Sequence, residues 1–207
     1  MSMIAAIVLA AGESSRMGSP KARLPYPKPD GSTSTFLDHL LAVFEASQAA
    51  PVVVVFGHDA DNLASQFELG RARALVNRDY RDGMLSSIQL ALRALDHESI
   101  SGVLVCPVDH PDIDPKVVDI LIARFEEQPS PIVIPVHNGR RGHPVLFSRE
   151  VFAELFAAPK AVGARQLVWD HQEDLLEVEV SNAGVTVDID TPADYRAFRD
   201  QSARDGR

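Results

Sequence analysis

Short apolar runs alternate along the chain with segments in which apolar residues recur every three or four positions. The apolar runs predict buried β-strands, and the spaced segments predict amphipathic helices. The predicted strands are residues 4–11, 52–56, 73–76, 103–108, 132–136 and 144–147. The predicted helices are residues 35–47, 60–68, 83–95, 115–127, 149–157, 164–169 and 191–198. This alternation indicates βαβ units and a mostly parallel sheet, in one α/β domain over residues 1–207.

Three further parts of the chain have weaker patterns. Residues 24–34 contain three prolines and predict an extended connection with a turn. Residues 175–180 and 185–189 predict a hairpin-like pair of strands about Asn182. The polar residues 200–207 predict a frayed tail.

The net charge, the length of the first apolar segment and the cysteine content argue against several classes of protein. The 207 residues carry a net charge of −9, from 20 basic and 29 acidic side chains, which disfavours a nucleic-acid-binding surface. The first apolar segment is too short to span a bilayer and follows no charged region, so we expect neither a membrane anchor nor a secretory signal. Cys106 is the only cysteine and cannot form an internal disulfide, which predicts a reducing, cytoplasmic location.

The loop after the first strand is small, polar and basic. It contains Gly12, Gly18 and three serines, with Arg16 and Lys21 five residues apart. Small residues let backbone N–H groups approach an anion, and two cations neutralise it, so the loop predicts a phosphate site. It is neither a Walker loop nor G-x-G-x-x-G, because Ser14 occupies the second glycine position. The alternative interpretation is a solvated loop whose cations lie in water.

Aspartates follow two further apolar runs, where a parallel sheet places its ligand sites. Asp109 comes after residues 103–108 and can hold Mg²⁺, although an aspartate there can also serve the turn before the next helix. Asp188 and Asp190 are predicted on one face of their strand, so either can join Asp109 at a metal. For Asp190 the alternative is a cap of the last helix.

Weaker signals come from one serine and two histidines. Ser87 lies near the start of a predicted helix and can hydrogen-bond a ribose or base, or simply cap the helix. His110 precedes a proline, a position that favours a structural role. His143 lies in the turn Gly142-His143-Pro144, where it can contact a substrate or remain in solvent.

Taken in order, these clusters resemble a known family. Residues 9–21, LAAGESSRMGSPK, resemble the nucleotidyltransferase signature L-A-[AG]-G-x-S-x-R-M-G-x-[PD]-K. Asn77 with GMLSSI, the Asp-x-Pro of Asp109, the G-x-P-V-L-F run and DIDTPADY then follow in the order of the molybdenum-cofactor cytidylyltransferase branch of the MobA-like NTP transferases. The matches extend from Leu9 to Tyr195.

The resemblance implies a fold and an activity. The fold is a single Rossmann-like domain of three layers with a mostly parallel mixed sheet, similar to the nucleotide-diphospho-sugar transferases. The activity is transfer of a nucleoside monophosphate, with CMP from CTP favoured, to a phosphorylated acceptor such as molybdopterin, with release of pyrophosphate. Mg²⁺ is the implied metal, with Mn²⁺ as its substitute.

The resemblance also assigns roles to individual residues. Catalytic roles fall to Arg16, Lys21 and Asp109. The residues expected to contact the nucleotide are Leu9, Ala10, Ala11, Gly12, Arg16, Lys21, Asn77 and Ser87. Asp109 and Asp190 are expected to hold the metal, and His110 and His143 to lie on the acceptor side.

Two departures from the family pattern leave the acceptor open. This chain has Gly-His-Pro at 142–144, where the family often has Gly-Asn-Pro, and its Val-Asp-His-Pro strand end also differs. Ala11 is bulkier than the glycine of the guanylyltransferase form LAGG and favours CTP, but one methyl discriminates by only ~1–3 kcal/mol. The alternatives are GTP, a different acceptor, or a maturation partner that carries cofactor to a molybdenum enzyme without turnover. The missing G-x-G-x-x-G disfavours a redox dinucleotide-binding protein.

Overall fold

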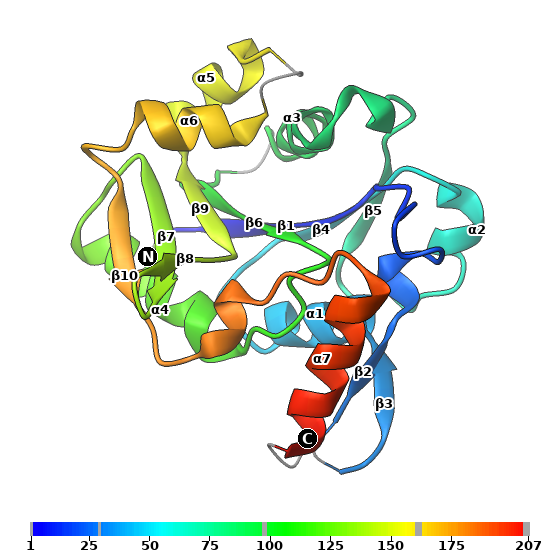
Figure 1. The fold of residues 1–207 in the computed structure, drawn as a ribbon. Helices are drawn as coiled ribbons and strands as arrows, with labels where there is room; N and C mark the ends of the chain where they lie inside the picture. The colour runs from blue at the N-terminus through cyan, green and yellow to red at the C-terminus, as the bar shows by residue number, and fades with distance from the viewer. Residues whose placement is uncertain (1, 29, 97–98, 160–162, 205–207) are drawn as a thin grey trace.

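One eight-stranded sheet runs through the computed structural model, which describes residues 2–28, 30–96, 99–159 and 163–204 (Figure 1). The strand order is β10-β7-β9-β6-β1-β4-β5, and β8 pairs with β7. Strands β6, β1, β4 and β5 are mutually parallel, whereas β9 runs antiparallel between β6 and β7. The predicted mostly parallel mixed sheet is therefore confirmed. The strands of this sheet are β1 (Ile4–Ala10), β4 (Val52–Phe56), β5 (Arg73–Val76), β6 (Gly102–Pro107), β7 (Ile132–His137), β8 (Arg140–Arg141), β9 (Val145–Ser148) and β10 (Leu176–Glu179).

The central strand β1 explains the three layers. All seven of its residues are buried, and they alternate between two apolar cores, with Ala6 and Val8 in one and Ile7 and Leu9 in the other. Helices α1, α4 and α7 cover the first face of the sheet, and α3, α5 and α6 cover the second (Figure 1). A strand covered on both sides must be apolar at every position, which is the pattern of residues 4–10.

The helices begin where the sequence offers caps. The Thr35 hydroxyl accepts a hydrogen bond from the Asp38 backbone N–H, and the Asp38 carboxylate accepts one from the Thr35 N–H, forming a capping box. The Asp114 carboxylate caps α4 by accepting a hydrogen bond from the Val117 N–H, with Pro115 in the first turn. The helices are α1 (Phe36–Glu45), α2 (Ala60–Ala64), α3 (Met84–Leu95), α4 (Pro115–Glu127), α5 (Phe152–Ala157), α6 (Ala164–Asp170) and α7 (Pro192–Arg204). Helix α2 ends at Ala64, four residues before its predicted end.

The extended connection with a turn predicted for residues 24–34 takes the form of a small antiparallel hairpin, β2 (Pro25–Pro27) with β3 (Thr33–Thr35). Two other predictions need correction. The hairpin predicted for 175–189 is wrong, because β10 pairs in parallel with β7, and residues 183–190 form a 3₁₀ turn, Ala183–Thr186, followed by irregular chain. The predicted frayed tail is helical as far as Arg204, with Ser202 buried, while residues 205–207 lie outside the described part of the chain.

Candidate active site

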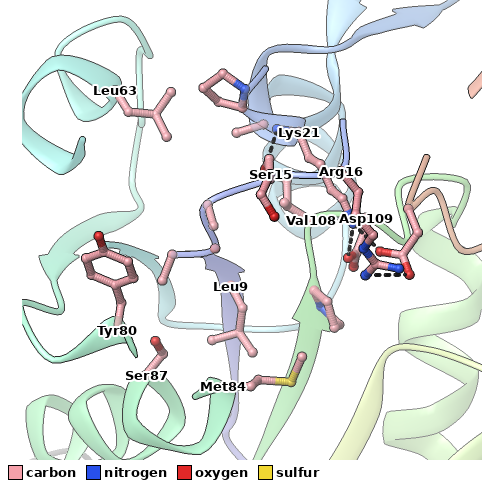
Figure 2. Close-up of a pocket in the computed structure, with 18 of the residues that line it drawn as sticks. Leu9, Ser15, Arg16, Lys21, Leu63, Tyr80, Met84, Ser87, Val108 and Asp109 are labelled. Carbon is pink, nitrogen blue, oxygen red and sulfur yellow. Dashed lines mark hydrogen bonds and ion pairs between the residues drawn. The ribbon is translucent and has the colours of Figure 1, made fainter. Parts of the chain in front are cut away.

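A cavity of about 350 Å³ opens at the carboxyl ends of β1 and β6 (Figure 2). Parallel sheets bind ligands at this edge. The cavity brings together most of the predicted site residues, namely Leu9, Ala10, Ala11, Gly12, Arg16, Lys21, Ser87, Asp109 and Asp190. Asn77, His110 and His143 are not among its lining residues.

The loop after β1 is folded around one serine. Ser14 adopts a left-handed conformation, with φ 51°, and its carbonyl accepts hydrogen bonds from the N–H groups of Met17 and Gly18 at 2.9 and 3.0 Å. The Ser14 hydroxyl accepts a further bond from the Lys21 N–H at 3.1 Å. A Cβ built on Gly12 would meet no atom within 4 Å, so packing of the described residues does not demand glycine there. A ligand lying close to the backbone would demand it.

Lys21 joins two carboxylates that are far apart in sequence. Its Nζ lies 2.8 Å from Asp109 Oδ2 and 2.5 Å from Asp190 Oδ1. Arg16 reaches the other Asp190 oxygen at 3.0 Å (Figure 2). The Lys21 side chain is only 11% exposed, and that of Arg16 is 67% exposed, so Lys21 forms the floor of the cluster and Arg16 its rim.

These contacts shift the pKa values of the paired groups. Burial alone would lower the pKa of Lys21, but the hydrogen bonds and charges of Asp109 and Asp190 outweigh it and raise that pKa. The hydrogen bond from Lys21, with help from Arg16, lowers the pKa of Asp190. Both side chains are therefore held in their charged forms at neutral pH.

Asp190 reaches the cavity on an irregular segment that also carries Asp188, and close packing against two loops holds that segment in place. A Cβ on Gly184 would collide with the carbonyl of Asp112, and a Cβ on Gly142 would collide with that of Val185. The Ile189 N–H also donates to the Asp109 carbonyl at 3.0 Å. Two glycines and a backbone hydrogen bond thus position Asp188 and Asp190, where the sequence predicts a strand.

The wall opposite the charged cluster is uncharged. Asn77 is buried and donates from Nδ2 to the hydroxyls of Ser86 and Ser87, at 2.8 and 2.9 Å. Asn77 therefore stands behind Ser87, which itself lines the cavity. Asn77 therefore has the geometry of a residue that positions Ser87, whereas the sequence predicts that Asn77 itself contacts the nucleotide.

Tyr80, Met84 and Leu63 also line this wall, and the sequence did not single them out. Met84 is 54% exposed and lines the cavity, so its apolar side chain is available to a ligand there. Tyr80 is connected to the loop after β1, because its hydroxyl lies 3.3 Å from Glu13 Oε1, to which Arg81 also donates at 3.0 Å. The sequence offers one signal for this wall, a methionine directly after Gly83 at the predicted start of a helix.

His110 and His143 lie together beside Asp109. Their ring centroids are 4.1 Å apart, and the Nδ1 atoms of both are buried without a hydrogen-bond partner among the described residues. Burial, followed by the neighbouring His110, lowers the pKa of His143 to about 3, so this ring is neutral at pH 7. Partial burial, followed by the charge of Asp109, raises the pKa of Asp188.

The donor atoms around Asp109 suit a divalent cation. One ligand atom each from Asp109, His110 and Asp188 lies within 4.8 Å of the others. The single ammonium group of Lys21 already bridges Asp109 and Asp190, so these oxygens converge on a point that a cation can occupy. Carboxylate oxygens are the ligands that Mg²⁺ and Mn²⁺ prefer.

The comparisons with known proteins show the family to which the chain belongs. The model of the MobA-like NTP transferase domain matches residues 6–175. The molybdenum cofactor cytidylyltransferase of Escherichia coli K12 is 31% identical over 94% of this chain and 95% of its own length. A probable molybdenum cofactor guanylyltransferase of Mycobacterium avium is 29% identical over 94% of both chains.

A solved structure with a similar fold is that of a related chain. The manganese complex of Rv0371c from Mycobacterium tuberculosis H37Rv superposes with a TM-score of 0.79 and 27% identity, over 95% of this chain and 98% of that one. Of the helices in the described residues, none combines the length and the apolar character that crossing a bilayer requires.

Proposed function

Since the chain belongs to the MobA-like NTP transferase family, we propose that it transfers CMP from CTP to the phosphate of a molybdenum-cofactor-type acceptor and releases pyrophosphate. In this reaction an acceptor phosphate oxygen attacks the α-phosphorus of the nucleotide, and the bond to the bridging oxygen of pyrophosphate breaks. The observation that carries the proposal is the convergence of Lys21, Asp109 and Asp190 at the mouth of the loop after β1.

In this proposal, different residues of the chain bind the base, the ribose and the phosphates. The backbone of residues 9–12, with Ser87, lies where a base and ribose can be held, and Tyr80 and Met84 offer apolar surface to the base. Arg16 and Lys21 lie where they can neutralise the triphosphate and the charge that develops on the leaving pyrophosphate. Such reactions need alignment and electrostatic stabilisation more than a protein nucleophile.

A divalent ion, Mg²⁺ or Mn²⁺, is proposed beside Asp109. When bound it would supply positive charge to the α-phosphate and the leaving group. Asp109 holds the ion in this proposal, and the second carboxylate comes from Asp188 or Asp190, both of which lie near Asp109. When nucleotide binds, Lys21 exchanges a carboxylate for a phosphate oxygen, which its mobile ammonium can do without movement of the backbone.

GTP is the second candidate substrate, favoured by the relatives named as probable guanylyltransferases. The difference between the two nucleotides is tested by measuring pyrophosphate release with each NTP, molybdopterin and Mg²⁺ or Mn²⁺. We expect turnover with CTP to exceed turnover with GTP. Preferred turnover with GTP would reverse the assignment of the nucleotide, and absence of turnover with every NTP and both metals would refute the proposal in favour of a cofactor carrier.

Nucleotide binding is measured separately by thermal stabilisation. A nucleotide that binds the native state raises the melting temperature, by a free energy that grows with the ratio of its concentration to its Kd. We expect the largest shift with CTP and a divalent ion. Asp61→Asn, an exposed aspartate in the first turn of α2, serves as a matched control for Asp109→Asn.

A further inference from the structure

The carboxylates around Asp109 are not equivalent. Asp190 is already neutralised, because Lys21 binds one of its oxygens and Arg16 the other. Asp188 makes no hydrogen bond or ion pair that the described residues reveal. The second oxygen free to ligate a cation therefore belongs to Asp188.

His110 completes a set of donors on the same side. A ring nitrogen of His110 and one oxygen each of Asp109 and Asp188 lie within 4.8 Å of one another. An ion with ligand distances near 2.1 Å separates its ligands by up to about 4.2 Å. Small rotations of these side chains would close the set, and the Ile189–Asp109 backbone hydrogen bond already fixes the two loops that carry them.

The two imidazoles give an independent sign of a ligand. Buried polar atoms are nearly always hydrogen-bonded, yet the Nδ1 atoms of both His110 and His143 are buried without a partner in the described structure. Lys21 donates to Asp109 and Asp190 and, within the described structure, to neither imidazole ring. The rings are packed together, so His143 limits the orientations open to His110.

We propose, building on the function above, that this chain binds its divalent ion through Asp109, Asp188 and an imidazole nitrogen of His110, and that it prefers Mn²⁺ to Mg²⁺. Both ions take carboxylate oxygens, but Mg²⁺ is a hard ion that keeps to oxygen ligands, whereas Mn²⁺, a first-row transition metal, accepts one imidazole nitrogen more readily than Mg²⁺ does. His143 is a positioning residue that holds the His110 ring. Asp190 remains with Lys21 and Arg16 until nucleotide enters.

The test is electron spin-echo spectroscopy of Mn²⁺ added to the protein without nucleotide. We expect nitrogen modulation from one imidazole, which His110→Gln abolishes. Titration calorimetry should show the ratio of Mn²⁺ to Mg²⁺ affinity falling by at least ~10-fold in His110→Gln, the scale seen when the surroundings of a metal ligand are altered. Asp188→Asn should weaken Mn²⁺ binding more than Asp190→Asn. Far-UV circular dichroism establishes that each variant is folded.

Several outcomes would overturn the proposal. Absence of nitrogen modulation would do so, as would modulation that survives His110→Gln and disappears in His143→Gln. A stronger effect from Asp190→Asn than from Asp188→Asn would assign the second carboxylate to Asp190. Failure of the proposed function gives a distinguishable result. In that case the nitrogen modulation would be present in a protein that turns over no NTP. Turnover without any nitrogen signal would leave the function standing and remove the His110 ligand.

Discussion

Two corners of the site meet at Asp109 and differ in how their charges are balanced. In the phosphate corner, made of Arg16, Lys21 and Asp190, each ionised group has a partner of opposite charge within 3.0 Å. In the imidazole corner, made of His110, His143 and Asp188, the described residues supply no hydrogen-bond partner for either Nδ1 and no ion pair for the Asp188 carboxylate, on which Lys21 acts only at longer range. The phosphate corner is therefore preformed. The imidazole corner instead has polar atoms without partners, which a bound ion from outside the chain would supply.

The largest effect is expected where the corners join. Asp109→Asn keeps the shape of the side chain and removes the charge that binds Lys21 and that we propose to bind the ion. We expect kcat to fall by about 10²–10³-fold, the scale of a lost electrostatic contact at a transition state, with little change in melting temperature. Steady-state pyrophosphate release measures it, with Asp61→Asn as control. Normal turnover would reduce Asp109 to a turn residue.

Removing Lys21 should affect the phosphate corner alone. Lys21→Met leaves the carboxylates of Asp109 and Asp190 without their shared cation. We expect kcat/KM for the nucleotide to fall by about 10–100-fold, because triphosphate binding loses a buried charge. Mn²⁺ binding without nucleotide should persist, since the proposed ligands Asp109, Asp188 and His110 all remain in this variant. Lys28→Met, an exposed lysine between β2 and β3, is the control. Loss of Mn²⁺ binding in Lys21→Met would show that the two corners act as one.

The phosphate corner was largely predictable from sequence, and the reasons are local. An apolar run that ends in small residues and two cations specifies a buried strand followed by an anion loop, and Ile4–Ala10 forms that strand. The cap at Thr35 and the start of α4 at Pro115 follow from the same short-range rules. The contact of Lys21 with Asp190, 169 residues away, does not follow from these rules, because Asp190 lies on an irregular segment that only the tertiary fold brings beside the loop after β1.

The imidazole corner was less predictable because its geometry is long-range. Alternating residues at 185–189 have the pattern of a strand, but Gly184 packs against the Asp112 carbonyl and turns the chain there instead. Only the tertiary fold brings Asp188 beside His110. Asn77 was placed at the nucleotide, and its burial behind Ser87 depends on the packing of α3, which periodicity alone does not reveal.

A smaller effect is expected at the nucleotide wall. Ala11 lines the cavity and fills the space beside Gly57, where a Cβ would come within 2.8 Å of the Ala11 Cβ. Ala11→Gly should raise kcat/KM for GTP relative to CTP by about 10-fold, because one methyl is worth ~1–3 kcal/mol in a packed pocket. Ala11→Ser keeps the bulk and should keep the preference for CTP. An unchanged ratio in Ala11→Gly would place the discrimination at Tyr80 or Met84 instead.

The two corners should also differ in the pH range over which acid weakens them. The lowered pKa of Asp190 means that its pairing stabilises the fold above pH 3.8, and that this contribution is lost only as the pH falls below that value. His143 has a folded pKa of about 3 against 6.5 for the free side chain, so the unfolded chain binds a proton between these values that the folded chain does not. The imidazole corner therefore loses stability as the pH falls from 6.5 towards 3.

This acid sensitivity gives the smallest expected effect, since it is absent at neutral pH. His143→Gln cannot titrate, so its free energy of unfolding should fall less than that of the unmodified protein between pH 6.5 and 4, by up to about 1.4 kcal/mol per pH unit. Urea unfolding at pH 7, 6, 5 and 4 measures the difference, and His137→Gln controls for the loss of a histidine elsewhere. Parallel pH profiles for His143→Gln and the unmodified protein would mean that folding leaves the pKa of His143 unchanged. His143 would then gain its positive charge below pH 6.5 in the fold as well, and burial of its ring would not exclude the proton.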